Sequence, residues 1–266
     1  LPQNISSNTF DSGNTFIMLM LQTGQDIYNE DLYTTDYNSM KTTDIKKVNL
    51  TNFMTQDSIR VFEQWTKFYT VFSFDQTFDA FSRFRTGEMP LVVQPYTFYN
   101  QLSVAAPEIK GLWDFTMVPG TKQADGTINH AANSAGSGAV IFNKVSNQAA
   151  AWDFVKWFTS TDIQVDYGKQ IEALMGPMGR FDTANVEALE QLPWSTAEYE
   201  KISSQQSYLR EVPIIPASYA VTRHINNAFR MVVNDAGNPR YTLMSYNDQI
   251  KSEIVRKYQE LSSVKK

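Results

Sequence analysis

The chain of 266 residues contains 42% hydrophobic and 19% charged residues, which is the composition of a globular protein and excludes a disordered or collagen-like chain. Its 28 acidic and 23 basic residues give a formal net charge of −5, so we expect no binding to nucleic acid, whose phosphate backbone requires a basic surface. Cysteine is absent, which excludes disulfides, thiolate metal ligands and cysteine nucleophiles.

The first half of the chain predicts short helices and apolar runs. A helix is predicted to follow Thr55, a residue type that caps helices, because apolar side chains then recur every three or four residues. A second helix over residues 78–86 is predicted to end at Gly87. Residues 89–94 form a short apolar run bounded by prolines, which favours a buried strand. Helical spacing returns over residues 96–105.

The middle of the chain predicts strands followed by one helix. Residues 113–121 are predicted to form a strand that ends in a Pro-Gly turn. A glycine-rich segment then leads into a predicted strand over residues 139–142. Residues 147–160 predict a helix whose apolar face is buried. The residues of that face are Ala151, Phe154, Val155 and Phe158.

The C-terminal third is predicted to be almost entirely helical. Candidate helices cover residues 183–192, 197–212 and 219–233, and a fourth occupies the closing segment. The apolar face of the third helix consists of Val221, Ile225, Ala228 and Val232. That of the closing helix consists of Leu243, Tyr246, Ile250, Ile254, Tyr258 and Leu261. Helices and short strands are mixed along the chain, which predicts an α/β fold.

No motif in the sequence indicates catalysis or a cofactor. His130 and His224 lie far apart in the chain, and nothing spaces them as metal ligands. The glycine-rich SAGSG precedes a predicted strand, whereas a phosphate-binding loop opens a helix. The carboxylates are dispersed, and helix capping explains Asp75 and Asp79. We therefore predict no enzymatic activity, no catalytic residue, no metal and no cofactor.

Aromatic residues make up 13% of the chain and allow two interpretations. One is a large core rich in phenylalanine, and the other is a set of aromatic platforms for a ligand. Tyrosine, tryptophan, asparagine and glutamine together suit a neutral, hydroxyl-rich ligand, because flat sugar faces stack on rings while amides pair with hydroxyls.

Four segments, in order, resemble the extracellular solute-binding proteins (family 1) of bacterial ABC importers. The first is FSRFRTGEMPLVVQPYTFYNQLSVAAPEIKGLWDFTMVPGT, in which a helix ends in F-x-x-G-E and an apolar run and an aromatic residue follow. The others are GRFDTANVEALEQLPW, PIIPASYAVTRHINNAFR and NDQIKSEIVRKYQEL, which resemble the Gram-positive, lipoprotein-type branch. The resemblance runs from about residue 10 to the end of the chain.

The resemblance implies a type II periplasmic-binding-protein-like α/β fold with two lobes and a ligand held between them. On the layout of the maltose-binding-protein-like members, residues 1–113 form the first part of the C-terminal lobe. Residues 114–170 cross over and contribute to the N-terminal lobe, and residues 171–266 form the helical remainder of the C-terminal lobe. The family's opening βαβ units and its lipoprotein signal are absent from this sequence, so we expect one nearly complete lobe and part of the other.

The function implied by the resemblance is that of the extracellular substrate-binding component of an ABC importer. Such a protein binds a carbohydrate, here expected to be an oligosaccharide, without turnover and delivers it to a membrane permease. It is expected to be a monomer, anchored as a lipoprotein through a segment absent from this chain. Two alternatives stay open: the same fold binding a peptide or polyamine, and a surface interaction or sensing protein.

Seven ligand contacts are implied by the resemblance. Tyr96 follows the first apolar run at the position where relatives place a sugar-stacking aromatic residue. The other six are Asn14, Phe16, Asn133, Ser134, Tyr219 and Arg223. Trp194 follows a proline and is either a further contact or a residue that only fills the core.

Overall fold

The computed structural model describes residues 13–134 and 138–264, which fall into two compact units. Of the described residues, unit 1 contains 79–117 and 138–207, and unit 2 contains 13–78, 118–134 and 208–264. The chain thus passes from one unit to the other at positions that differ from the predicted boundaries at 113 and 170. Which family lobe each segment forms stays a prediction.

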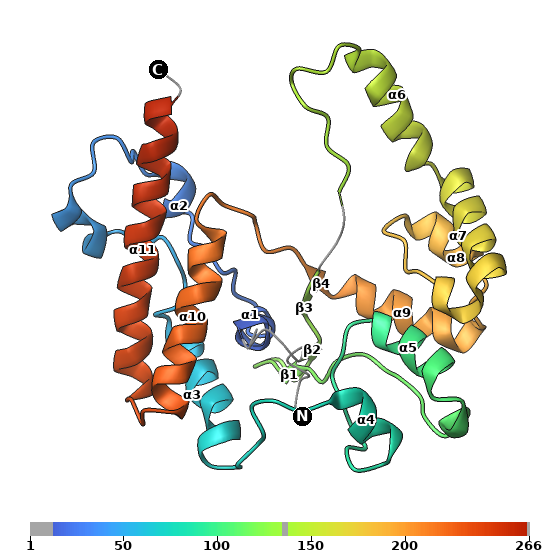
Figure 1. Ribbon diagram of the computed structural model, residues 1–266. Helices are drawn as coiled ribbons and strands as arrows, with labels where there is room; N and C mark the ends of the chain where they lie inside the picture. The colour runs from blue at the N-terminus through green and yellow to red at the C-terminus, as the bar shows by residue number, and fades with distance from the viewer. Residues whose placement is uncertain (1–12, 135–137, 265–266) are drawn as a thin grey trace. The chain divides into compact units, whose positions relative to one another are not determined.

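Unit 2 is built mainly from helices that pack around an aromatic core. These are α1 (Gly13–Leu21), α2 (Asp31–Thr34), the 3-10 helix η1 (Thr42–Lys47), α3 (Gln56–Thr70), α10 (Ser218–Val233) and α11 (Pro239–Val264) (Figure 1). Trp65 of α3 is fully buried, with the ring of Phe16 at 5.8 Å and that of Phe229 at 4.4 Å. Side chains from α1, α3 and α10 therefore meet in a single core.

The helices of unit 2 follow the predicted periodicity closely. The Thr55 hydroxyl accepts a hydrogen bond from the Ser58 amide at 3.2 Å, which confirms it as the N-cap of α3. All four residues of the predicted apolar face of α10 are buried. In α11 the side chains of Leu243, Ile250 and Ile254 are fully buried, whereas Leu261 is 47% exposed.

The strands of unit 2 are short and are tied to α1 by one buried glutamine. β1 (Thr121–Lys122) pairs antiparallel with β2 (Ile128–Asn129), and β3 (Ala132–Asn133) pairs parallel with β4 (Leu209–Arg210). Gln22, at the end of α1, donates to the carbonyl oxygens of Pro119 at 2.9 Å and Ala131 at 3.2 Å. The sequence predicted helix over residues 197–212, but the helix ends at Ser207 and β4 follows.

Unit 1 contains helices around a small core. These are α4 (Ala80–Arg85), α5 (Thr97–Ala105), η2 (Pro107–Ile109), α6 (Gln148–Phe158), α7 (Thr161–Met175), η3 (Gly176–Gly179), α8 (Val186–Gln191) and α9 (Thr196–Ser207). Gly168 of α7 lets the helix approach the core: an added Cβ would lie 2.4 Å from Leu192 Cδ2 and 2.9 Å from Phe181 Cε1. The buried residues of this core are Leu189, Leu192 and Ile202.

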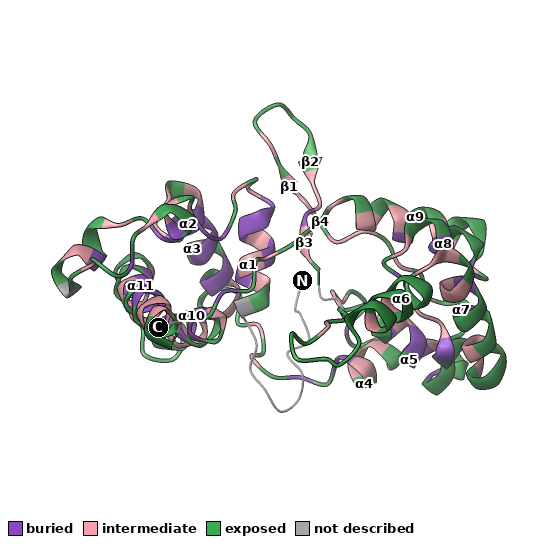
Figure 2. Ribbon diagram, turned by 90° about the horizontal axis from the view of Figure 1, so that it is seen from above, coloured by how far each residue is buried: buried purple, intermediate pink, exposed green. Residues whose placement is uncertain are grey.

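Three predictions for strands and burial in unit 1 are wrong. Residues 89–94 and 139–142, all of them described, form no strand, and Leu91 and Phe142 are 62% and 78% exposed. Helix α6 forms as predicted, but none of its residues is buried, and Figure 2 shows most of it as exposed. An apolar run signals a tendency to be buried, yet burial and strand pairing also require a neighbouring segment, which the local pattern does not reveal.

The predicted strand over residues 113–121 is also wrong for most of its length, because only its last residue belongs to β1.

None of the described helices combines the length and the apolar character that crossing a bilayer requires.

Candidate functional site

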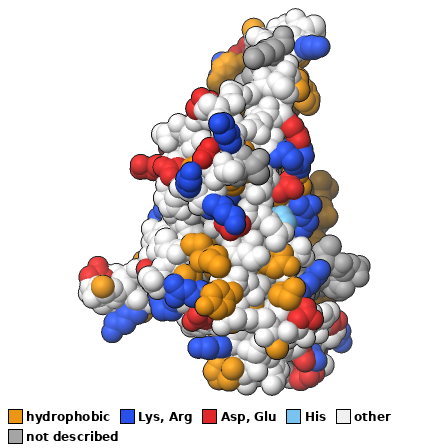
Figure 3. All heavy atoms as spheres, turned by 90° about the vertical axis from the view of Figure 1, so that its left-hand side faces the viewer, with side chains coloured by type: hydrophobic (Ala, Val, Ile, Leu, Met, Phe, Trp, Pro, Cys, Tyr) orange, Lys and Arg blue, Asp and Glu red, His pale blue; other side chains and the backbone are white. Residues whose placement is uncertain are grey.

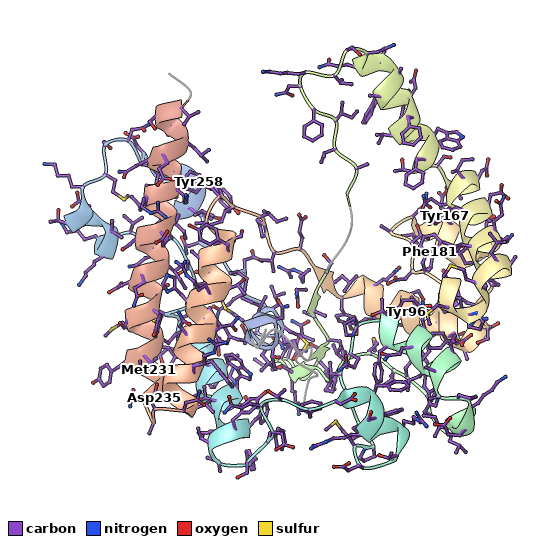
Figure 4. The ribbon with its side chains drawn as sticks, viewed as in Figure 1. Tyr96, Tyr167, Phe181, Met231, Asp235 and Tyr258 are labelled. Atoms are coloured by element: carbon purple, nitrogen blue, oxygen red, sulfur yellow. The ribbon has the colours of Figure 1, made fainter. Side chains whose placement is uncertain are left out.

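Tyr96 lies at the start of α5, in an aromatic cluster within unit 1 (Figure 4). Its ring stacks on that of Tyr99, with centroids 5.7 Å apart and planes inclined by 17°. The Trp194 ring is inclined to it by 75°, with the ring centroids 5.5 Å apart. Tyr96 and Tyr99 are three residues apart, so the start of α5 places both on one face, while Pro193 and Trp194 come from the segment between α8 and α9.

Charged side chains border this cluster through a chain of hydrogen bonds. Arg180, which follows η3, donates from Nε to Glu172 Oε1 at 2.7 Å and from Nη1 to the Tyr99 hydroxyl at 2.9 Å. Its guanidinium carbon lies 5.6 Å from the centre of the Trp194 ring. The Tyr99 hydroxyl in turn donates to Glu198 Oε1. Arg180 therefore links two carboxylates and two aromatic rings.

The position of Arg180 is fixed from both sides. Its backbone carbonyl accepts a hydrogen bond from Asn100 Nδ2 at 2.6 Å, and Asn100 is buried on α5. Glu198 is held by the start of α9, where the Ser195 amide donates to Glu198 Oε2 at 2.9 Å. Hydrogen bonds from neighbouring helices thus hold the charged groups in place, which is the arrangement that a binding site requires.

The protonation states of the site follow from burial and from these hydrogen bonds. Burial raises the pKa of Glu198, but the hydrogen bonds from Tyr99 and Ser195 together lower it by more than burial raises it. The net pKa is therefore below its ordinary value. Burial lowers the pKa of Arg180, but Glu172 raises it and the net pKa lies above its ordinary value. Burial also raises the pKa of Tyr96. At neutral pH Glu198 is therefore ionised, Arg180 carries its positive charge and the Tyr96 phenol is neutral.

Two buried polar groups of the cluster are unpaired. The Tyr96 hydroxyl and Trp194 Nε1 have no hydrogen-bond partner among the described residues. Leaving such a group buried and unpaired costs roughly 1–3 kcal/mol. A narrow hollow lies alongside, and it has no room for a separate water molecule. It is lined by Gly168, Glu172, Arg180, Phe181, Leu192, Pro193 and Trp194.

Tyr219 and Arg223, both on α10 of unit 2, form a second cluster. The guanidinium carbon of Arg223 lies 5.6 Å from the centre of the Tyr219 ring, which is half exposed. Glu253 of α11 lies 3.8 Å from Arg223 Nη2 and accepts a hydrogen bond from Arg256 at 2.6 Å. That hydrogen bond lowers the pKa of Glu253, so it is ionised at neutral pH.

An open groove of about 550 Å³ runs beside Tyr219. Its lining residues are Pro216, Tyr219, Lys257, Glu260, Leu261 and Val264. Over the face of unit 2 that carries α11, basic and acidic side chains are interspersed, as Figure 3 shows. Charges of both signs pair there with one another, which leaves the groove amphipathic without a single dominant charge.

The other four predicted contacts lie in unit 2 in different settings. Phe16 is fully buried, and its ring meets those of Phe53, Phe62 and Trp65, so the structure places it in the core with no face open to a ligand. Asn14 is exposed at the start of α1. Asn133 pairs with Arg210 in the β3–β4 ladder. Ser134 is exposed and donates its amide to the Arg210 carbonyl at 3.1 Å.

The sequence interpretation missed the charged half of the Tyr96 cluster. Glu172, Arg180 and Glu198 carry no motif, because Arg180 bonds partners 8 and 81 residues away in the chain. One local signal was available: Ser195 followed three residues later by Glu198 is the capping-box pattern at a helix start. It indicates how Glu198 is held but not that Tyr99 donates to it.

Comparisons with known proteins match this chain to one family and to several solved structures. Residues 6–165 match the family described as bacterial extracellular solute-binding protein, and no curated protein matches the chain. A solute-binding protein of an ABC transporter from Thermotoga lettingae, bound with alpha-D-tagatose, is similar over 95% of this chain and 59% of its own, with a TM-score of 0.64 and 14% identity.

Two further solved structures are similar. An ABC substrate-binding protein from Listeria monocytogenes in complex with cycloalternan covers 90% of this chain and 56% of its own, with a TM-score of 0.56 and 15% identity. The maltose-maltodextrin binding protein of Alicyclobacillus acidocaldarius covers 94% of this chain and 66% of its own, with a TM-score of 0.52 and 14% identity.

The chain spans between 56% and 66% of the length of these three proteins. At such low identity the similarity shows the fold, which is the type II periplasmic-binding-protein-like α/β fold, as predicted. The family and the similar structures are substrate-binding proteins and not enzymes, as also predicted. Because the family match covers more than half of its residues, the chain belongs to the bacterial extracellular solute-binding proteins.

Proposed function

We propose that the chain is the substrate-binding component of a bacterial ABC importer and that it binds an oligosaccharide without turnover. Membership of the solute-binding family supports the first part. The names of the three similar structures, which mention tagatose, cycloalternan and maltose-maltodextrin, support a sugar as the ligand. Delivery to a membrane permease, a monomeric state and a lipid anchor belong to the same proposal.

The observation that carries this proposal is the combination of rings and unpaired polar groups around Tyr96. The apolar face of a sugar stacks on aromatic rings, and its hydroxyl groups both donate and accept hydrogen bonds. The Tyr96 hydroxyl and Trp194 Nε1 lack partners among the described residues, and Arg180 and Glu198 supply charged donors and acceptors next to them. A sugar satisfies these groups together, whereas a purely apolar ligand leaves them unpaired.

Ligand binding at this cluster requires side-chain movement. The adjoining hollow has no room for a separate water molecule, so a sugar ring enters only when Trp194 or Tyr96 turns away from its neighbour. The unpaired hydroxyl and indole nitrogen make the closed arrangement of the rings less stable by roughly 1–3 kcal/mol each. Hydrogen bonds from the ligand remove that penalty and contribute to affinity.

A surface interaction protein is the second candidate, and one observation favours it. Helix α6 exposes a large apolar surface, with Trp152, Phe154 and Trp157 between 54% and 60% exposed. Contiguous apolar surface of this kind marks interaction sites in soluble proteins. We favour the receptor interpretation because the rings at Tyr96 are bordered by the hydrogen-bonded side chains of Arg180 and Glu198.

Calorimetric titration of the chain separates these candidates. We expect binding to maltotetraose or alpha-D-tagatose, recovery of the sugar unchanged after incubation, and no binding to spermidine or to a neutral tetrapeptide. Binding to spermidine or the peptide alone would replace the sugar by that ligand class. A folded chain that binds none of the four would contradict the receptor function and favour an interaction protein.

A further inference from the structure

We propose that Glu172 and Glu198 make the Tyr96–Trp194 cluster selective for uncharged glycans, because they neutralise Arg180, the guanidinium beside the rings. The inference rests on the proposed sugar-binding function and goes further by naming the residues that determine which sugars are accepted.

Arg180 is engaged by carboxylates directly and through Tyr99. Glu172 Oε1 accepts from Nε at 2.7 Å, and Glu198 Oε1 lies 3.8 Å from Nη1. The side chains of Arg180, Glu172 and Glu198 are 21%, 17% and 25% exposed. Charges held away from water in this way act on one another more strongly than an exposed surface pair does.

An acidic glycan therefore meets an unfavourable charge balance at this cluster. Its carboxylate either displaces Glu172 from Arg180, which leaves Glu172 partly buried without its partner, or it accepts from another N–H of a guanidinium whose charge Glu172 already balances. It also approaches the ionised Glu198. A neutral sugar hydroxyl requires no such exchange, because it donates to a carboxylate oxygen or accepts from the guanidinium while the Arg180–Glu172 pair stays intact.

Glu172 is the residue on which this selectivity is best tested. It lies in the last turn of α7, so its substitution leaves the start of α9 untouched. Glu198 holds that start through hydrogen bonds from the amide and the hydroxyl of Ser195, and its substitution would disturb the helix as well as the charge. Glu172→Gln keeps the shape of the side chain and removes one negative charge.

The experiment compares a neutral glucan tetramer with the same tetramer oxidised to carry a terminal glucuronic acid. In the wild-type chain we expect binding of the neutral glycan and at least about tenfold weaker binding of the acidic one. In Glu172→Gln the acidic glycan should gain about tenfold in affinity, and the gain should shrink at high salt. Glu190→Gln, on the exposed side of α8, is the matched control and should change neither affinity.

A second substitution separates a charge effect from a disturbed structure. Adding Arg180→Met to Glu172→Gln should abolish the gain for the acidic glycan, while circular dichroism confirms that both variants are folded. A wild-type chain that binds both glycans equally, or a Glu172→Gln variant without any gain, would overturn the inference and leave the sugar-binding function in place. A wild-type chain that binds neither glycan contradicts the sugar-binding function itself.

Discussion

Tyr96→Phe should stabilise the protein and weaken ligand binding, which is an unusual pairing. The substitution keeps the ring that stacks on Tyr99 at 5.7 Å and meets Trp194 at 5.5 Å. It removes a buried hydroxyl that has no hydrogen-bond partner among the described residues. Removing such a group recovers part of a penalty of roughly 1–3 kcal/mol, so the free energy of unfolding should rise by about 1 kcal/mol.

Ligand affinity should move in the opposite direction. If a sugar hydroxyl pairs with the Tyr96 hydroxyl, its loss should cost about 0.5–1.5 kcal/mol, which is a factor of roughly 2 to 12 in the dissociation constant. Tyr96→Ala also removes the ring and should weaken binding by about 1–3 kcal/mol while lowering stability. Urea denaturation measures the stability and calorimetric titration measures the affinity.

The matched control is Tyr241→Phe, because Tyr241 is 67% exposed on α11 and should respond in neither assay. A Tyr96→Phe variant that is less stable than the wild type would show that the hydroxyl is paired in solution. One that binds the sugar as tightly as the wild type would show that the hydroxyl does not contact the ligand. Either result refutes the reasoning that places the ligand at this ring.

Three further predictions concern buried residues of the two units. Phe16→Ala should lower the free energy of unfolding, measured by urea denaturation, by about 3–5 kcal/mol, because the ring is fully buried. Reduced sugar affinity at unchanged stability would instead indicate that Phe16 contacts the ligand. Gly168→Ala should lower the free energy of unfolding by about 1–3 kcal/mol and with it the melting temperature, since the added Cβ would lie 2.4 Å from Leu192 Cδ2. An unchanged melting temperature would mean that the core of unit 1 is not closely packed at this position. Burial and the neighbouring Arg223 lower the pKa of His224 below its ordinary value of 6.5, so the folded state binds a proton there more weakly than the unfolded chain does. The free energy of unfolding should therefore fall as the pH drops through about 6.5. The free energy of unfolding of the His224→Gln variant should fall less over the same pH interval. Parallel curves of stability against pH for the two proteins would contradict the assignment of this effect to His224.

The helices were predictable because their signals are local. The residues that bury the inner face of α10 recur every three or four positions, and Thr55 caps α3 through an amide only three residues away. Strand pairing has no such local record. β3 pairs with β4 across more than 70 residues of sequence, and neither strand is longer than two residues. Helix α6 also carries an apolar face, yet burial depends on a neighbour that its own sequence does not specify.

Phe16 and Tyr96 show why the site was predictable only in part. The family resemblance implied both as ligand contacts, Phe16 at the entry to a helix and Tyr96 after an apolar run, but the two helices differ in their apolar pattern. Phe16 opens the run FIMLML, whose side chains are apolar on every face of the helix, and a helix of that kind is buried. The α5 sequence TFYNQLSVA buries Phe98 and Leu102 on one face, whereas Tyr99 stacks with Tyr96, the residue before the helix, on another. That second face becomes a candidate site only through Arg180 and Glu198, which lie far away in the sequence. The polar character of the Tyr96 cluster therefore arises from tertiary packing. It could be recognised only from the folded structure.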